Sequence, residues 1–421
     1  MYQKVILDNG LRIVTAYMPH TQSVCLSIFV GTGSRYETDA QAGISHFIEH
    51  LCFRGTTKRK TSRDVSEAIE GVGGILNAGT DKEVTIYWCK VAKQHLPLAM
   101  DVLNDMLLNS RFDPQDMEKE RQVIIDEIDM SLDSPAQRVD MLIDEMIWPH
   151  HPMGRDIAGT RESVTGITRG ALLSYMQVQY MPANTVIAIA GNIEPGETVA
   201  AVNKALGGWN SQPSRQAYLP YLEQKAASKV FIERRDTEQA HLCLALPGLS
   251  LFHPERFVLD ILSGILGEGM SSRLFTEIRD RLGLAYSIHS CVEHFLDTGS
   301  ITVSASVEPR NLPVAVTAIL EQVGRLREAV PETELTKAKE MAKGRLILRM
   351  EDSRSVAGWM GGQEILSGNI LSTDEVVSRI EAITTRDIQK LAGEMLIGEY
   401  LKLAVVGPVE NDGSLEKLLK L

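Results

Sequence analysis

Apolar runs predict strands near the beginning of the chain. Residues 5–14 form two apolar stretches around Asn9-Gly10, a dipeptide typical of a tight hairpin turn, and residues 23–30 form a continuous apolar run. Residues 83–91 form a further strand-like run, and long segments with helical periodicity follow. Strands and helices are grouped and the hairpins are short. This order favours an α+β fold with a largely antiparallel sheet covered by helices over a doubly wound parallel sheet.

The same order recurs in the second half of the chain. Three pairs of residues in matching sequence contexts are 217, 217 and 216 positions apart: Gly31 and Gly248, Pro114 and Pro331, and Gly191 and Gly407. This near-constant spacing predicts two duplicated domains. We place them at residues 1–210 and 225–421, joined by a linker at residues 211–224 that is rich in polar residues and proline.

Charge and cysteine content exclude several classes of protein. The chain has 43 basic and 55 acidic side chains, a formal net charge of -12, so binding to nucleic acid has no electrostatic basis. Five cysteines, an odd number without a CxxC pair, indicate reduced buried thiols. We find no membrane span and no secretory signal, and therefore expect a cytoplasmic protein.

One short segment carries candidate metal chemistry. In residues 42–56, His46, Glu49 and His50 form the pattern HxxEH. On a helix these three side chains share one face, while the apolar residues between them lie on the opposite face and can pack on a sheet. Two imidazoles one turn apart can bind zinc, and a carboxylate beside them can take a proton from water. Chance placement on a solvated helix face is the alternative.

A catalytic zinc site normally has a third protein ligand. In residues 111–130, Asp113 is placed to cap a helix that Pro114 begins, and Glu120 and Glu127 lie seven residues apart on one face of it. Either glutamate could equally belong to a solvated acidic stripe. The residues alone do not choose between them.

With these motifs the sequence resembles the pitrilysin/insulinase family of zinc metallopeptidases, which have the inverted HxxEH motif and include the mitochondrial processing peptidase. In that family a glutamate ligand follows the motif at a characteristic spacing, which, counted from His50, here reaches Glu127. The resemblance implies one Zn²⁺ per chain bound by His46, His50 and Glu127. It also implies that Glu49 is the general base and that Glu120 supports the site.

The resemblance extends over essentially the whole chain and implies further site residues. Asn77 and Ala78 match the edge strand that pairs with the substrate as an added β-strand. Arg279 and Tyr286 match a pair that reaches across to the zinc domain, where the tyrosine stabilises the oxyanion and the arginine assists substrate placement. Without the resemblance, residues 77–80 would be interpreted as a plain turn that enters a strand, and Arg279 could equally be a surface charge and Tyr286 a packed aromatic.

The repeat tests which half binds metal. The offset that relates Gly31 to Gly248 takes His46, His50 and Glu127 to Ser263, Gly267 and Gly344, none of which is a zinc ligand. Only the first domain is therefore expected to hold the metal. In the resembled family such a two-domain chain is half of a clam-shell chamber, which implies a homodimer or, alternatively, a heterodimer with an inactive homologue.

The sequence therefore predicts a zinc metalloendopeptidase that cleaves peptides or unfolded segments. The main alternative is a non-catalytic structural or assembly subunit of the same fold. Such subunits usually lack an intact HxxEH set, which this chain retains. A zinc hydrolase acting on a non-peptide amide fits the local chemistry but not the predicted substrate strand.

Overall fold

The computed structural model describes residues 2–210, 217–222 and 228–421. Residues 211–216 and 223–224 of the predicted linker lie outside these ranges. The chain forms two compact units. They largely follow the two halves of the chain, but Met130–Gly154 belongs to the second unit and Ile347–Ser372 to the first.

The first unit is built on a six-stranded sheet in the order β1-β2-β6-β3-β5-β4. Its strands are β1 (Tyr2–Ile6), β2 (Arg12–Tyr17), β3 (Ser23–Val30), β4 (Ile75–Thr80), β5 (Thr85–Ala92) and β6 (Thr185–Gly191). The predicted turn at Asn9-Gly10 joins β1 to β2, and Gly10 has a φ of 87°, which favours glycine. The β2–β6 pair is parallel and the other pairs are antiparallel.

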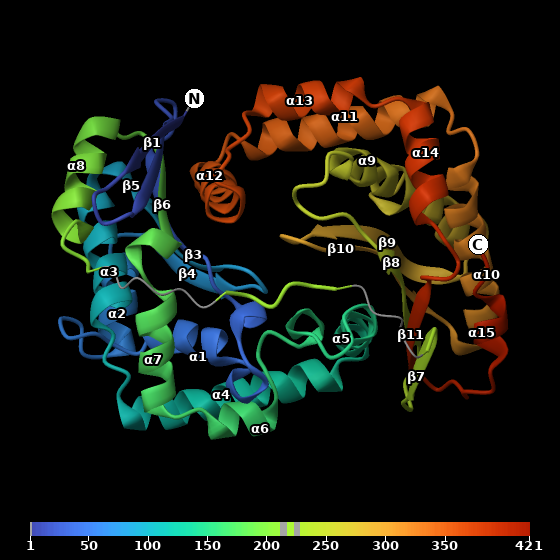
Figure 1. Cartoon of the computed structure of the whole chain (residues 1–421), viewed down its shortest axis with the longest axis horizontal. Helices are drawn as coiled ribbons and strands as arrows, with labels where there is room; N and C mark the ends of the chain where they lie inside the picture. The colour runs from blue at the N-terminus through green and yellow to red at the C-terminus, as the bar shows by residue number, and fades with distance from the viewer. Residues whose placement is uncertain (1, 211–216, 223–227) are drawn as a thin grey trace. The chain divides into compact units, whose positions relative to one another are not determined.

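Helices cover both faces of this sheet (Figure 1). Helix α3 packs against β3 and β5, α8 packs against β2, and α12 lies on the other face, over β3 and β6. The helices of this unit are α1 (Ile44–Cys52), α2 (Ser62–Glu70), α3 (Leu96–Asn109), most of α4 (Pro114–Asp133), α6 (Arg161–Gly166), α7 (Arg169–Gln179), α8 (Pro195–Leu206) and α12 (Ser353–Ser367).

The second unit is built on a five-stranded sheet in the order β7-β11-β8-β10-β9. Its strands are β7 (Val230–Arg234), β8 (Ala240–Pro247), β9 (Ala285–His294), β10 (Gly299–Val307) and β11 (Lys402–Gly407). The helices that begin in this unit are α5 (Pro135–Ile147), α9 (Arg256–Gly267), a π-helix at Phe275–Arg281, α10 (Leu312–Gly324), α11 (Glu332–Arg349), α13 (Thr373–Ala382), α14 (Thr385–Met395) and α15 (Ser414–Leu418).

The two sheets have the same topology. Strands β7, β11, β8, β10 and β9 correspond in order to β2, β6, β3, β5 and β4, and each pair has the same parallel or antiparallel sense. Strand β8 begins and ends at the same offset from β3 that relates Gly248 to Gly31 in the sequence. The predicted α+β fold with two duplicated, largely antiparallel sheets covered by helices is thus confirmed.

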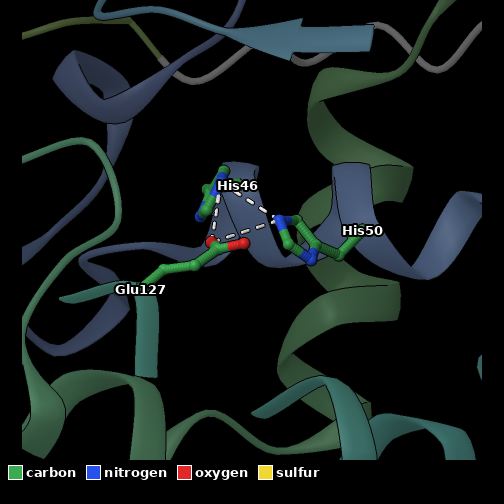
Figure 2. Close-up of side chains that lie close together, drawn as sticks. All are labelled: His46, His50 and Glu127. Atoms are coloured by element: carbon green, nitrogen blue, oxygen red, sulfur yellow. Dashed lines mark hydrogen bonds and ion pairs between the residues drawn. The ribbon is translucent and has the colours of Figure 1, made fainter. Parts of the chain in front are cut away.

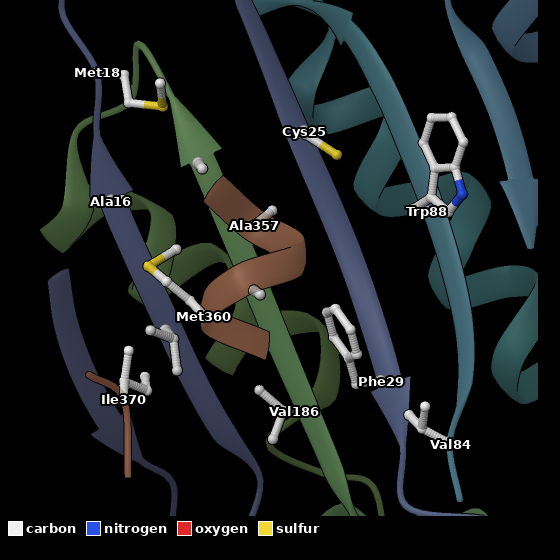
Figure 3. Close-up of a cluster of buried hydrophobic side chains, with 13 residues drawn as sticks. Ala16, Met18, Cys25, Phe29, Val84, Trp88, Val186, Ala357, Met360 and Ile370 are labelled. Atoms are coloured by element: carbon white, nitrogen blue, oxygen red, sulfur yellow. The ribbon is translucent and has the colours of Figure 1, made fainter. Parts of the chain in front are cut away.

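Two equivalent helices cover the sheet of the opposite half of the chain. Helix α12 comes from the second half but packs on β3 and β6, whereas α5 comes from the first half but packs on β8 and β11. In the core under α12, Phe29 and Val186 of the sheet contact the helix face that carries Ala357 and Met360 (Figure 3). These four side chains are each at most 3% exposed, so α12 is an integral part of the first unit.

Four of the five cysteines are buried and Cys291 is exposed; all five are free thiols. The expectation of burial holds for four of the cysteines and fails at Cys291, which lies on the edge strand β9. Within residues 2–210, 217–222 and 228–421, no helix combines the length and the apolarity that a membrane crossing requires.

Candidate active site

Helix α1 places the HxxEH side chains together. Its apolar residues Ile44, Phe47, Ile48 and Leu51 are at most 1% exposed, which leaves His46, Glu49 and His50 half-buried on the remaining face. This is the amphipathic arrangement that the spacing predicts.

The start of α1 is held by Glu37. The backbone N–H groups of Gly43 and Ser45 donate to its two carboxylate oxygens at 2.8 and 2.9 Å. Gly43 has a φ of 89°, and a Cβ there would lie 2.3 Å from the Ala158 carbonyl oxygen, so glycine is required. Burial raises the pKa of Glu37, and the bonds from these N–H groups oppose that rise. A carboxylate at a helix N-terminus also interacts favourably with the helix dipole.

The ligand atoms of His46, His50 and Glu127 converge on one point (Figure 2). The Nε2 atoms of the two histidines are 3.2 Å apart, and an oxygen of Glu127 lies 3.8 Å from His46 Nε2 and 3.6 Å from His50 Nε2. Across the described part of the chain, this is the one group of His, Cys, Asp or Glu side chains close enough together to hold a metal ion.

These separations fit a zinc ion. Tetrahedral zinc with bonds of about 2.0–2.1 Å to nitrogen and oxygen separates its ligands by roughly 3.3 Å.

Burial and the neighbouring His50 lower the pKa of His46 to about 4, which favours the neutral imidazole that binds metals. Burial acts to lower the pKa of His50, but the hydrogen bond to Glu120 and the nearby carboxylates outweigh it and raise that pKa. The same carboxylates favour a divalent cation.

Glu120 fixes the orientation of His50. One of its oxygens lies 3.0 Å from His50 Nδ1, and the other forms an ion pair with Arg54. With Nδ1–H donating to the carboxylate, the lone pair of Nε2 is directed at the common point. The Glu120 side chain is 3% exposed, whereas that of Glu127 is 43% exposed, so the two glutamates have different environments on the same face of α4.

Glu49 lies beside this group and is bonded to the edge strand. The hydroxyl of Thr80, the last residue of β4, donates to a Glu49 carboxylate oxygen at 2.5 Å. Burial raises the pKa of Glu49, and the hydrogen bond from Thr80 opposes that rise. The candidate base is therefore a positioned, half-buried carboxylate rather than a freely moving surface group.

Asn77 and Ala78 lie in β4, which pairs with β5 at the edge of the first sheet. The Asn77 side chain is exposed, and its oxygen accepts the Ala78 N–H at 2.7 Å. Residues 77–80 thus form a strand, and the alternative reading as a plain turn is wrong. An edge strand can accept an extended peptide by backbone hydrogen bonding.

The hairpin that ends β4 is anchored from one side. The N–H groups of Ser34 and Arg35 donate to the carbonyls of Asp81 and Lys82 at 3.3 and 2.9 Å. A Cβ on Gly33 would lie 1.9 Å from the Asp81 carbonyl, so the two backbones approach closely. The Arg35 guanidinium and the Glu83 carboxylate form a buried ion pair. The hairpin tip is therefore rigidly seated.

Arg279 and Tyr286 belong to the second unit. The Arg279 guanidinium lies 4.6 Å from the ring centre of Phe275 and 5.7 Å from that of Tyr286. Tyr286 is 76% exposed, which rules out the alternative of a packed aromatic. Their implied roles stay a prediction.

The second unit keeps the helix but not the ligands. Ser263, the equivalent of His46, is buried, and its hydroxyl lies 2.8 Å from that of Ser290. At Gly267, the equivalent of His50, a Cβ would lie 2.5 Å from the Ser290 backbone nitrogen. Helix α9 thus packs too closely on β9 to leave space for a second imidazole.

Glu37 and Thr80 were not among the predicted site residues. A helix that starts at a glycine without a side-chain cap needs an acceptor, and the acidic residue just upstream was a usable signal. Strand alternation could have placed Thr80 on the same face as Ala78. Its partner Glu49 is 31 residues away, a contact that no local pattern predicts.

Two family models and several curated proteins match the chain. Residues 12–161 match the model of the insulinase family (peptidase family M16), and residues 166–342 match that of the peptidase M16 inactive domain. The chain is 34% identical to the uncharacterized zinc protease YmxG of Bacillus subtilis, over 98% of this chain and 99% of that protein. It is 35% identical to an uncharacterized zinc protease of Mycobacterium leprae, over 99% and 94% of the two chains.

Solved structures show the same fold. A protease from Helicobacter pylori superposes with a TM-score of 0.91 at 22% identity, covering 97% of this chain and 99% of that one. A peptidase M16 inactive domain from Pseudomonas fluorescens superposes with a TM-score of 0.89 at 15% identity, covering 97% and 98%. Because the two zinc protease relatives match it over nearly its whole length, the chain belongs to the M16 (insulinase) family of peptidases.

Proposed function

We propose that the protein is a zinc-dependent endopeptidase that cleaves peptides or unfolded segments bound as an added strand on β4. The main support for this function is that the candidate ligand atoms of His46, His50 and Glu127 lie close together beside Glu49. The retained ligand set favours this function over a non-catalytic subunit. Zinc bound there would act as a Lewis acid that polarises the scissile carbonyl and acidifies water.

The protein residues would divide the remaining work. Glu49 accepts a proton from the attacking water while the water oxygen bonds to the scissile carbonyl carbon. Glu49 then gives that proton to the amide nitrogen as the C–N bond breaks. Glu120 keeps His50 in the ligating tautomer. Asn77 and Ala78 hold the substrate backbone extended, a requirement that excludes stably folded regions.

Replacement of the base tests this function. Glu49→Gln removes the proton acceptor but none of the three zinc ligands, so we expect peptidase activity to fall by about 10²–10⁴-fold. Zinc content per chain and the unfolding temperature should stay unchanged. Cleavage of an unstructured, internally quenched peptide, with and without a chelator, measures the effect.

Glu67→Gln is the matched control, because Glu67 is an exposed residue paired with Arg63 on α2. Activity retained in Glu49→Gln would reject the assigned base. A zinc-loaded wild type that cleaves no unstructured peptide would reject the function itself. The homodimer that the resemblance implies, with a heterodimer as the alternative, stays a prediction, which the molecular mass in solution would test.

A further inference from the structure

Thr80 connects the strand proposed to bind substrate with the proposed base. Along β4, Leu76, Ala78 and Thr80 are half-buried while the residues between them are exposed, and α1 packs against this strand. The Thr80 hydroxyl reaches Glu49 on α1 at 2.5 Å. The Thr80 hydroxyl, with a weaker contribution from the Thr80 backbone N–H, therefore joins the two elements that must meet at the scissile bond.

The donor is held in place by its surroundings. Thr80 pairs with Thr85 at the end of the β4–β5 ladder, and the turn beyond it closes through a bond of 2.8 Å from the Asp81 N–H to the Val84 carbonyl. The backbone of Ser34 and Arg35 holds the turn from outside. Thr80 therefore cannot shift without the whole hairpin.

The segment that holds the hairpin also supports the helix that carries the acceptor, Glu49. Residues 33–37 bind the hairpin tip through Ser34 and Arg35 and bind the first turn of α1 through Glu37. One short, buried segment thus contacts both the strand that carries Thr80 and the helix that carries Glu49. The distance between the two side chains is a built-in feature of the fold.

We propose that Thr80 is a positioning residue for the proposed peptidase reaction and sets the orientation of the Glu49 carboxylate. This inference rests on the proposed function. The bond from the Thr80 hydroxyl engages Oε2 of Glu49, and the carboxylate keeps further lone pairs that can accept the proton of the attacking water. Without the hydroxyl, the carboxylate keeps only the weaker backbone interaction with Thr80 and samples more orientations, few of which face both the water and a peptide docked on β4.

The test compares Thr80→Val with Thr80→Ser. Valine keeps the volume and branching of threonine but removes the hydroxyl, whereas serine retains it. We expect Thr80→Val to lower kcat by about 10- to 100-fold, the usual range for a group that orients a site residue. KM for a quenched peptide and the zinc dissociation constant of the metal-free protein should each change by less than about twofold, because Thr80 contacts no ligand. Thr80→Ser should restore most of kcat.

Thr198→Val is the control, because the Thr198 hydroxyl bonds to the Glu194 carbonyl on α8, away from the site residues. Unchanged kcat in Thr80→Val, or equal losses in Thr80→Val and Thr80→Ser, would overturn the inference while an active wild type preserves the proposed function. If Thr80→Val fails to fold, Thr80→Ala replaces it and is judged by the same two criteria. A fall in zinc affinity that matches the fall in kcat would also overturn the inference, because it would assign the effect to the metal.

Discussion

Glu120 makes its contribution through His50. Its buried carboxylate accepts the Nδ1–H of that histidine and pairs with the more exposed Arg54. We expect Glu120→Gln to weaken zinc binding by about 10- to 100-fold, because a neutral amide orients the imidazole less strongly and leaves Arg54 without its partner charge. Competition with a chromogenic chelator measures the dissociation constant.

Glu118→Gln serves as the control for this prediction. Glu118 lies two residues earlier on α4, but its side chain is 66% exposed and pairs with Arg121. Its replacement should leave zinc affinity unchanged. The proposed role of Glu120 fails if the two variants lose zinc affinity equally or if neither does.

Helical spacing explains how much of the candidate site could be predicted from sequence. His46, Glu49 and His50 share a face because residues three and four apart on a helix are neighbours. Glu127 could not be separated from Glu120 by local pattern, and only the resemblance to a known family chose between them. Glu37 was missed although it lies just upstream of the helix start that it holds, whereas Thr80 acts through a contact to a helix 31 residues away that no local pattern predicts.

At the scale of elements, α12 packs on the first sheet with unusual closeness. A Cβ on Gly361 would lie 2.0 Å from Cε2 of Phe29, whose ring is 1% exposed. Because a buried ring cannot move aside freely, we expect Gly361→Ala to lower the free energy of unfolding by about 1–3 kcal/mol. Urea denaturation followed by far-ultraviolet circular dichroism measures the change.

The same helix supplies two controls. Added Cβ atoms on Gly358 and Gly362 would meet nothing within 4 Å. Alanine at either position should therefore raise stability by about 0.5–1 kcal/mol through its better helix propensity. A neutral or stabilising Gly361→Ala would mean that α12 does not pack on Phe29 as described.

The order of strands and helices was predictable, but the sheet that each helix covers was not. Apolar runs and Asn9-Gly10 mark β1, β2 and β3 in the sequence. Helices α5 and α12 are equivalent in the repeat, and nothing in their local sequence says which of two similar sheets each one covers. Because duplication makes the sheets alike, the exchange of these two helices depends on tertiary packing and leaves no local signature.

At the scale of the whole molecule, the two duplicated units differ in their metal ligands, because the candidate ligand group lies in the first unit. Zinc should therefore stabilise the protein through that unit. A ligand that binds only the folded state stabilises it by about 2.7 kcal/mol at a concentration 100 times its dissociation constant. We therefore expect zinc to raise the unfolding temperature of the wild type, and a chelator to reverse the rise. His46→Ala should abolish this zinc-dependent shift, because it removes a ligand from the group in the first unit.

Ser263→Ala is the matched variant at the equivalent position of the second unit. It removes a buried hydroxyl and should lower stability with and without zinc to the same extent, so the zinc-dependent shift persists. Differential scanning calorimetry on the metal-free and zinc-loaded forms separates the two effects. A zinc shift that survives His46→Ala, or one that disappears in Ser263→Ala, would show that the metal binds elsewhere. The first outcome would remove the structural basis of the proposed peptidase, whereas the second would reassign the metal to the half of the chain in which Gly267 leaves no space for an imidazole.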